Sequence, residues 1–144
     1  MKDKVNVSLL LCFARSGGTM VNRYLSALKD CIVLSEVHPL HSLKGDKYHL
    51  GYQAENWYGL KTNDIIYDRA LTQTLSAARD ESKHVIIRDW IYIDFVPRRL
   101  NSHSPRLSST NLGLLKDMNI EFNTVIYVRD AIYVYLAQKD SLER

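Results

Sequence analysis

Only two cysteines, Cys12 and Cys31, occur among the 144 residues, which excludes a dense disulfide framework, and their spacing is not that of a C-x-x-C pair. We expect both to be buried, reduced thiols. Long hydrophobic runs are also missing, because the longest, residues 5–13, is interrupted by polar residues and falls far short of the roughly 20 residues that cross a bilayer. No membrane anchor or secretory signal is indicated, which favours a cytoplasmic protein without a membrane partner.

The chain has little excess of charge of either sign. Nineteen Lys and Arg residues against 16 Asp and Glu residues give a net charge of +3, which is too small to indicate a nucleic-acid partner. With 46% hydrophobic and 24% charged residues, the composition is that of a globular protein. The length suits one domain over residues 1–144, and an oligomer stays possible.

Strand and helix patterns alternate along the chain. Four apolar runs, too far apart for hairpins, predict buried strands at residues 5–13, 31–35, 84–88 and 123–128. Helical spacing predicts helices at residues 19–29, 64–81, 110–118 and 131–143. Right-handed crossovers between parallel strands then imply an α/β fold, with a parallel sheet as the middle of three layers.

Two of the predicted helices have further expected features. The predicted buried face of the first helix consists of Met20, Tyr24, Leu25 and Leu28. Asn63 or Asp64 is the expected N-cap of the second helix. Residues 38–62 and 89–109 show no sustained period, and we expect them to be long connections, the first passing over the carboxyl ends of the strands.

A turn of small residues joins the first strand to the first helix. Ser16, Gly17, Gly18 and Thr19 follow the apolar run directly. Backbone N–H groups in such a turn can point inward, and the helix amino end adds partial positive charge, so the turn is a candidate anion site. Arg15 adds a forked array of donors. A plain connection with a solvated Arg15 is the alternative interpretation.

The turn differs from the triphosphate loop G-x-x-x-x-G-K-[ST]. With the last residue of that motif placed on Thr19, glycine would be required at Cys12 and lysine at Gly18, and both positions fail. The lysine that reaches the terminal phosphates is therefore missing, and Arg15 supplies a charge three positions upstream. An atypical P-loop kinase stays open as a less favoured alternative.

The segment from Ala14 through Arg15, Ser16, Gly17 and Gly18 to Thr19 resembles the 5′-phosphosulfate loop of the sulfotransferase family, with Ala14 in place of the common proline. Residues 127–136 resemble the family's 3′-phosphate segment and match its arginine with Arg129. Residues 34–36 and 87–90 are similar to blocks of the bacterial branch of the family.

This resemblance implies a P-loop NTPase-like topology and a protein that binds 3′-phosphoadenosine 5′-phosphosulfate (PAPS) or 3′,5′-adenosine bisphosphate. The implied activity is transfer of a sulfuryl group to a hydroxyl or amine of a small-molecule acceptor. Residues 14–19 and Arg129 would bind the nucleotide, and Arg15 would also stabilise the leaving group. Glu36 would accept the acceptor's proton. The candidate substrate-binding residues are Arg88, Asp89 and Trp90.

Several features keep other interpretations open. The family's segment usually has a serine where this chain has Ala137, and its late closing loop has no counterpart before Arg144. We therefore expect a truncated domain with little activity, and a non-catalytic nucleotide-binding or interaction domain is the main alternative. Glu36 could form an ion pair with Arg15 or Arg88, and Arg88 and Asp89 could be buried structural residues.

The histidines and loop aromatics have weaker claims to a site. His38 and His41 are rival bases, although we expect histidines of an irregular polar segment to be exposed, and no histidine pair has metal-ligand spacing with a carboxylate, so no metal site is predicted. Trp57 and Tyr58 could line a pocket or cap the core.

Overall fold

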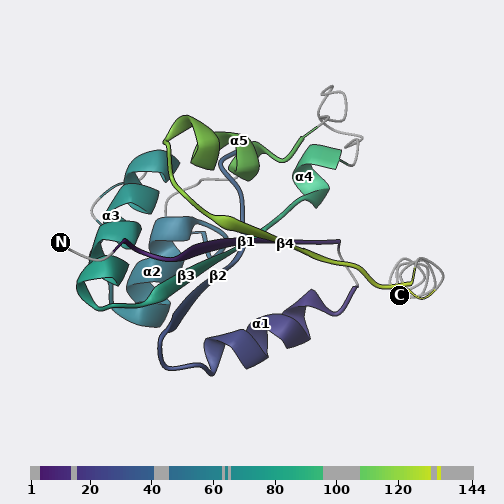
Figure 1. Cartoon of the computed structure of the whole chain (residues 1–144), viewed down its shortest axis with the longest axis horizontal. Coiled ribbons are helices and arrows are strands. Elements are labelled where there is room, and N and C mark those ends of the chain that lie inside the picture. Colours follow the sequence, from purple (N-terminus) through teal and green to yellow (C-terminus); the bar gives the residue numbers. More distant parts are fainter. Residues whose placement is uncertain are drawn as a thin grey trace.

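The computed structural model, which describes residues 4–13, 16–40, 46–62, 64, 66–95, 108–130 and 133, contains a four-stranded sheet (Figure 1). Its strands are β1 (Val7–Cys12), β2 (Cys31–Val37), β3 (His84–Asp89) and β4 (Asn123–Tyr127). They lie in the order β2-β3-β1-β4, and every neighbouring pair is parallel. The predicted parallel sheet is confirmed, and β2 continues to Val37, beyond the apolar run that predicted it.

Helices cover both faces of the sheet, as parallel strands require. Helix α1 (Gly18–Ser26) lies on one face, and α2 (Leu50–Tyr58), α3 (Tyr67–Asp80) and α5 (Thr110–Asp117) pack against the other (Figure 1). A single turn, α4 (Tyr92–Phe95), follows β3. The fold is therefore α/β. None of the helices in the described part of the chain combines the length and the apolar character needed to span a membrane.

Most of the apolar core lies between the sheet and helices α2, α3 and α5. Leu9, Leu34 and Ile87 from three strands are fully buried there, in one cluster with Leu71 of α3 and Leu115 of α5. Successive strand residues point to opposite faces, so their neighbours belong to a smaller cluster on the α1 face. The sheet residues of that second cluster are Leu10, Val33 and Ile86.

Helix α1 packs on this second cluster through Val21 and Leu25. Three of the four residues predicted for its buried face are instead exposed, namely Met20, Tyr24 and Leu28. Both sets recur at a spacing of four residues, so the pattern predicts the helix but not the side that meets the sheet. Cys12 and Cys31 are free thiols, the first buried and the second half-buried.

Two further differences from the sequence predictions concern helix starts. Helix α2 lies within residues 38–62, where no helix was predicted, and the side chain of His49 caps it by accepting a hydrogen bond from the Tyr52 N–H at 3.3 Å. Helix α3 has Ile66 as its N-cap, whereas Asp64 accepts a bond from the Ile66 N–H, and Asn63 lies outside the described residues. Apart from residue 133, the helix predicted at residues 131–143 lies outside the described residues.

Side chains of α2 form hydrogen bonds with backbone groups at the outer edge of β2. The Tyr58 hydroxyl accepts from the Val33 N–H at 2.9 Å and donates to the Val33 carbonyl at 3.0 Å. The Gln53 amide accepts from the Ser35 N–H at 2.6 Å and donates to the Ser35 carbonyl at 2.7 Å. An unpaired strand edge is a template for aggregation, and these side chains occupy the groups that another strand would bind.

Replacing Tyr58 with phenylalanine should lower the free energy of unfolding by about 1–3 kcal/mol, because both backbone groups of Val33 lose their partner while the ring volume is kept. Urea unfolding measures this change. Tyr24→Phe, on the exposed side of α1, is the control and should change stability by less than about 0.5 kcal/mol. Equal stability of Tyr58→Phe and the wild type would contradict a stabilising role for this hydroxyl.

Candidate functional site

The carboxyl ends of the strands bring the predicted site residues to one edge of the sheet. The register pairs Ser35 with Arg88 and Cys12 with Tyr127. In open α/β sheets, ligands bind at this edge. Of the predicted residues, Ala14 and Arg15 lie outside the described part of the chain. Those within it are Ser16, Gly17, Gly18, Thr19, Glu36, Arg88, Asp89, Trp90 and Arg129.

The turn between β1 and α1 depends on a left-handed residue. Gly17 has a φ of 97° and is the N-cap of α1, a conformation that favours glycine. The buried Ser16 donates its hydroxyl to the Phe13 carbonyl at 2.6 Å, so this hydroxyl stabilises the turn itself. No side-chain hydrogen bond within the described residues caps the helix, and the Met20 N–H donates to the Gly17 carbonyl at 2.9 Å. The N–H groups of Gly18 and Thr19, which come first, have no partner inside the helix. Those N–H groups remain available to an anion.

Arg88 is a buried cation beside this turn, with 4% of its surface exposed. Its guanidinium donates from Nε to Cys12 Sγ at 3.2 Å, from Nη1 to Ser35 Oγ at 3.3 Å and from Nη2 to Glu36 Oε1 at 2.9 Å. We call these four residues the Arg88 cluster. A Cβ on Gly18 would lie 2.7 Å from Cys12 Sγ and 2.8 Å from Arg88 Nη2. The first turn of α1 therefore needs glycine to leave room for the guanidinium.

Glu36 reaches Arg88 because of a bulge in β2. Ser35 pairs with Arg88 and Val37 pairs with Asp89, so Glu36 is an extra residue between two consecutive pairs. Its φ of 55° lies in the left-handed region, which is uncommon for a residue other than glycine. Bulges are found next to active sites, where they redirect a side chain. The ion pair with Arg88, one of the two pairings considered from the sequence, is present.

Asp89, the next residue of β3, lies on the opposite face. Its carboxylate accepts hydrogen bonds from the Ser109 hydroxyl and, at 2.7 Å, from Asn111 Nδ2. Asn111 Oδ1 in turn accepts from the Tyr67 hydroxyl at 2.7 Å. Burial raises the pKa of Asp89 while the bonds from Ser109 and Asn111 oppose the rise, and the pKa of Tyr67 is raised well above its usual value by burial and by Asp89. Arg88 and Asp89 are thus both buried, each with its own partners.

His38 and Asp94 lie beside Asp89, and both side chains are fully buried. His38 Nε2 lies 3.1 Å from Asp94 Oδ2 but without the geometry of a hydrogen bond. Asp94 accepts from the Thr110 N–H at 2.7 Å and from the Thr110 hydroxyl at 2.5 Å. The expectation that His38 is exposed is wrong, whereas His41 lies outside the described residues. The residues of this second group, which we call the Asp89 cluster, are His38, Tyr67, Asp89, Asp94, Ser109, Thr110 and Asn111.

The Asp89 cluster contains three possible metal ligands, because ligand atoms of His38, Asp89 and Asp94 lie within 4.8 Å of one another. The Leu40 N–H donates to His38 Nδ1 at 3.1 Å, which places the ring proton on Nε2, the atom that faces the carboxylates. Ligation through Nε2 would move that proton to Nδ1, against the Leu40 N–H. Both carboxylates also already accept bonds from α5 or the residue before it. The cluster is better suited to holding α5 than to binding a cation.

Two other predicted residues lie at the same edge but outside both clusters. Trp90 is half-buried and stacks on Tyr48, with 4.9 Å between the ring centroids. Arg129, two residues after β4, is exposed, and its guanidinium lies 5.6 Å from the ring centroid of Tyr133. Trp57 is half exposed, whereas Tyr58 is used at the β2 edge. Trp90 and Arg129 are thus accessible to a ligand at the carboxyl edge.

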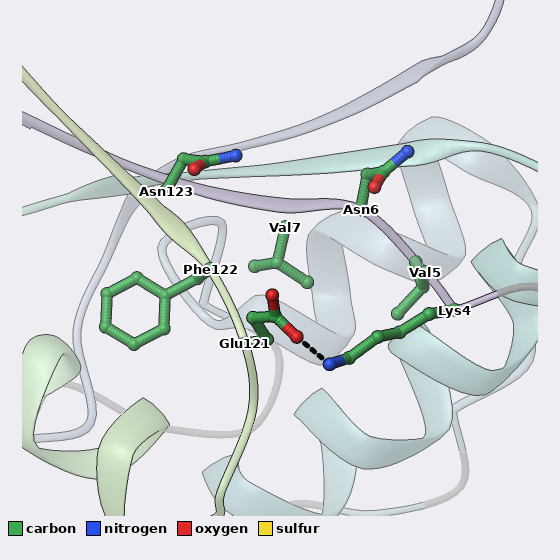
Figure 2. A pocket seen from close by; sticks show the side chains of 7 residues that line it. All are labelled: Lys4, Val5, Asn6, Val7, Glu121, Phe122 and Asn123. Atoms are coloured by element: carbon green, nitrogen blue, oxygen red, sulfur yellow. Dashed lines mark hydrogen bonds and ion pairs between the residues drawn. The ribbon is translucent and has the colours of Figure 1, made fainter.

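A hollow of about 150 Å³ lies at the other end of the sheet, next to the amino ends of β1 and β4. Figure 2 shows its lining, in which Lys4 forms an ion pair with Glu121, and Asn6 and Asn123 lie nearby. Both charged side chains are mostly exposed. A surface ion pair of this kind contributes little energy, and the hollow is distant from the strand ends where α/β proteins bind ligands. We do not regard it as the functional site.

The partners of Asp89 are not evident from the sequence. Ser109 precedes a helical pattern, which is a helix-start signal, and its hydroxyl indeed accepts from the Leu112 N–H at 3.1 Å. This signal predicts where α5 begins, but not that its first residues contact β3. His38 and Asp94 carried no local signal of burial, because their environment is created by contacts between segments far apart in the sequence.

Comparison of the chain with protein-family models, with curated proteins and with solved structures finds no match in any of the three.

Gly18→Ala should lower the free energy of unfolding by about 1–3 kcal/mol, the usual cost of overpacking, because the new methyl group meets Cys12 and Arg88. Gly113→Ala is the matched control, since no atom lies within 4 Å of its Cβ position and the residue is inside α5. That substitution should stabilise the protein by about 0.5–1 kcal/mol. Urea unfolding of both variants measures the difference, and equal effects would contradict the close contact at Gly18.

The free energy of unfolding should also depend on pH through Asp89. Because its folded-state pKa is raised above the ordinary value of 3.8, the folded protein binds this proton more tightly than the unfolded chain does. The resulting stabilisation is complete below pH 3.8, the ordinary pKa. It is lost as the pH rises through the higher pKa that Asp89 has in the folded protein. Asp89→Asn should lack this decline in urea unfolding across that interval, while Asp80→Asn at the exposed end of α3 should keep it. Parallel curves for the wild type and Asp89→Asn would exclude the effect.

Proposed function

We propose that the chain is a sulfotransferase-like domain that binds PAPS and transfers its sulfuryl group to a hydroxyl or amine of a small molecule. The observation that carries the proposal is the contact of the glycine turn at the start of α1 with the Arg88 and Glu36 ion pair. A helix amino end, a buried cation and a partly exposed carboxylate thereby share one edge of the sheet.

The strand order supports a P-loop NTPase-like topology for this domain. β1 is an inner strand, lies between β3 and β4, and leads through the glycine turn into α1. The segment that resembles the 5′-phosphosulfate loop begins after β1, and Arg129, in the segment that resembles the 3′-phosphate loop, follows β4. The two resembling segments therefore extend from adjacent parallel strands, as binding of one nucleotide by both would require.

Charge and shape at the turn favour an anionic ligand. The amino end of a helix carries about half a positive charge, and the Arg88 guanidinium lies directly against Gly18. Glu36 is the carboxylate that compensates Arg88 within the described residues. A phosphate or sulfate would accept hydrogen bonds from the free N–H groups of the first turn. The missing side chains of Gly17 and Gly18 allow a ligand to approach the backbone closely.

Each residue of the proposed site has a separate role. The donor supplies an activated sulfuryl group when it is bound. Backbone N–H groups of residues 17–19 would hold its 5′-phosphosulfate, because the Ser16 N–H already donates to the Phe13 carbonyl at 3.2 Å. Arg15 would stabilise the negative charge that develops on the bridging oxygen. Arg129 would bind the 3′-phosphate. Asp89, a candidate for substrate binding or for a buried structural role, is buried against the start of α5 and is left out of the proposed site.

Glu36 is proposed as the proton acceptor of the transfer. The acceptor oxygen or nitrogen forms a bond to sulfur while the bond from sulfur to the 5′-phosphate oxygen breaks, and the acceptor's proton passes to the Glu36 carboxylate. The products are the sulfated acceptor and 3′,5′-adenosine bisphosphate. The Glu36 side chain is 32% exposed, so an acceptor can reach it. Trp90, half-buried at the same edge, is the proposed aromatic contact for the acceptor.

One observation favours the alternative of a non-catalytic interaction domain. Large apolar side chains are exposed on α1 and on or just after β4, including Tyr24 at 72%, Ile126 at 68% and Val128 at 78%. Such surfaces often mark protein interaction sites. A domain of this type would bind the nucleotide without sulfating any acceptor. A P-loop kinase is less favoured, because Gly18 stands where its phosphate-binding lysine would be.

Calorimetric titration of the chain with 3′,5′-adenosine bisphosphate tests the proposed nucleotide site. Arg15→Ala should weaken binding by about 1.5–3 kcal/mol, the range for a hydrogen bond to a charged group. Arg23→Ala is the matched control, because Arg23 lies in the last turn of α1, at the end away from the glycine turn, and it should leave the affinity unchanged. Equal affinity of Arg15→Ala and the wild type would reject the role of Arg15. Wild-type protein that fails to bind the bisphosphate would contradict the proposed function.

A further inference from the structure

The Arg88 guanidinium connects Glu36 to the nucleotide turn. It is almost fully buried, and its three nitrogens donate to Cys12, Ser35 and Glu36. We infer that Arg88 is a positioning residue, which holds the Glu36 carboxylate in place for proton transfer and does not bind the substrate itself. This inference rests on the proposed function, and it replaces the candidate role of Arg88 in substrate binding.

The bulge of β2 is the first argument for this role. In regular β2 geometry, Val33 and Ser35 would face α1, while Leu34 and Glu36 would face the main core. Val37 belongs to the main core, which requires the alternation to shift by one residue at Glu36. The shift lets the Glu36 carboxylate reach Arg88 instead of entering the core.

The backbone of Glu36 is the second argument. Its φ of 55° is a conformation that residues other than glycine seldom adopt. Strained residues of this type persist only where surrounding contacts hold them, and they occur preferentially at functional sites. The 2.9 Å bond from Arg88 Nη2 to Glu36 Oε1 is such a contact. Loss of Arg88 would therefore release Glu36 toward other backbone and side-chain conformations.

The geometry of the guanidinium is the third argument. Its bonds from Nε to Cys12 and from Nη1 to Ser35 fix the plane of the group, and with it the direction of Nη2. A lysine donates all its hydrogen bonds from one nitrogen, so it could not reproduce bonds that Arg88 makes from three separate nitrogens. The same guanidinium lies against Gly18, so a single rigid side chain sets the spacing between the proposed base and the turn. A displacement of about 1 Å in such an arrangement can reduce a rate on the order of 100-fold.

The test compares Arg88→Gln with the wild type in a labelled-sulfate transfer assay and in calorimetry with 3′,5′-adenosine bisphosphate. A positioning role predicts a fall in kcat on the order of 100-fold, with the affinity for the bisphosphate changed by less than about threefold. Arg79→Gln, the same substitution on the partly exposed end of α3, should leave both values unchanged. Leu75→Ala, a core substitution in α3, controls for lost stability and should retain kcat when assayed well below its unfolding temperature.

A second pair of variants separates positioning from charge and from substrate contact. Arg88→Lys keeps the cation, and its kcat should lie between that of Arg88→Gln and that of the wild type. If Arg88→Gln does not fold, Arg88→Lys replaces it in the comparison with the wild type. Glu36→Asp shortens the side chain, so that its carboxylate no longer meets Arg88 in the same way. In a protein that already carries Glu36→Asp, Arg88→Gln should therefore reduce kcat far less than it reduces kcat in the wild type.

Several results would overturn the inference. Full activity of Arg88→Gln or Arg88→Lys would show that the fixed guanidinium is not needed. Parallel losses of bisphosphate affinity and kcat, or a higher acceptor KM at unchanged kcat, would make Arg88 a ligand. Equal effects of Arg88→Gln with and without Glu36→Asp would show that Arg88 does not act through Glu36. A wild-type chain that binds no bisphosphate and transfers no sulfate would instead refute the proposed function, and the inference would fall with it.

Discussion

The buried charge of Arg88 determines the structure of the carboxyl edge of the sheet. Transfer of a cation from water into a protein costs several kcal/mol unless a counter-ion and hydrogen-bond acceptors replace the water. Glu36 supplies the opposite charge, and Ser35 and Cys12 supply acceptors. Gly18 leaves the space that the group occupies. The bulge in β2 and the small residue at the start of α1 both follow from this requirement, so the geometry of the proposed site depends on one side chain.

Alternation of side chains along β3 gives the neighbouring residues Arg88 and Asp89 different functions. Arg88 faces α1 and the glycine turn, whereas Asp89 faces the main core and binds Ser109 and Asn111 at the start of α5. Asp94 binds Thr110 in the same region. The second face therefore uses its carboxylates to attach a helix, and the first uses its ion pair to shape the proposed site. The two residues of this short motif therefore have separate roles, because they lie on opposite faces of the sheet.

The parts of the fold that could be predicted from the sequence are those governed by local patterns. Buried parallel strands are continuous apolar runs, and a strand, a glycine turn and a helix follow one another directly, so the four strands and the start of α1 were found. The exposed side of α1 could not be predicted, because Met20 and Tyr24 have the same spacing as Val21 and Leu25. The environment of His38, the bulge at Glu36 and the helix at Leu50–Tyr58 depend on contacts with distant segments, such as Asp94 and Arg88, which no local pattern contains.

The apolar cores on the two faces of the sheet differ in size. Among the residues that the structure describes, sixteen buried apolar residues form the cluster beneath α2, α3 and α5, whereas three form the cluster beneath α1. Free energies of local opening follow the apolar area that a segment buries, so α1 is held less firmly than the helices of the other face. The first N–H groups of α1 are the proposed ligands of the 5′-phosphosulfate, and an anion bound there would stabilise the helix through charge as well as hydrogen bonds. The larger core thus supplies most of the apolar stabilisation, and an anion at the first turn of α1 would add stability to the helix that the smaller core holds.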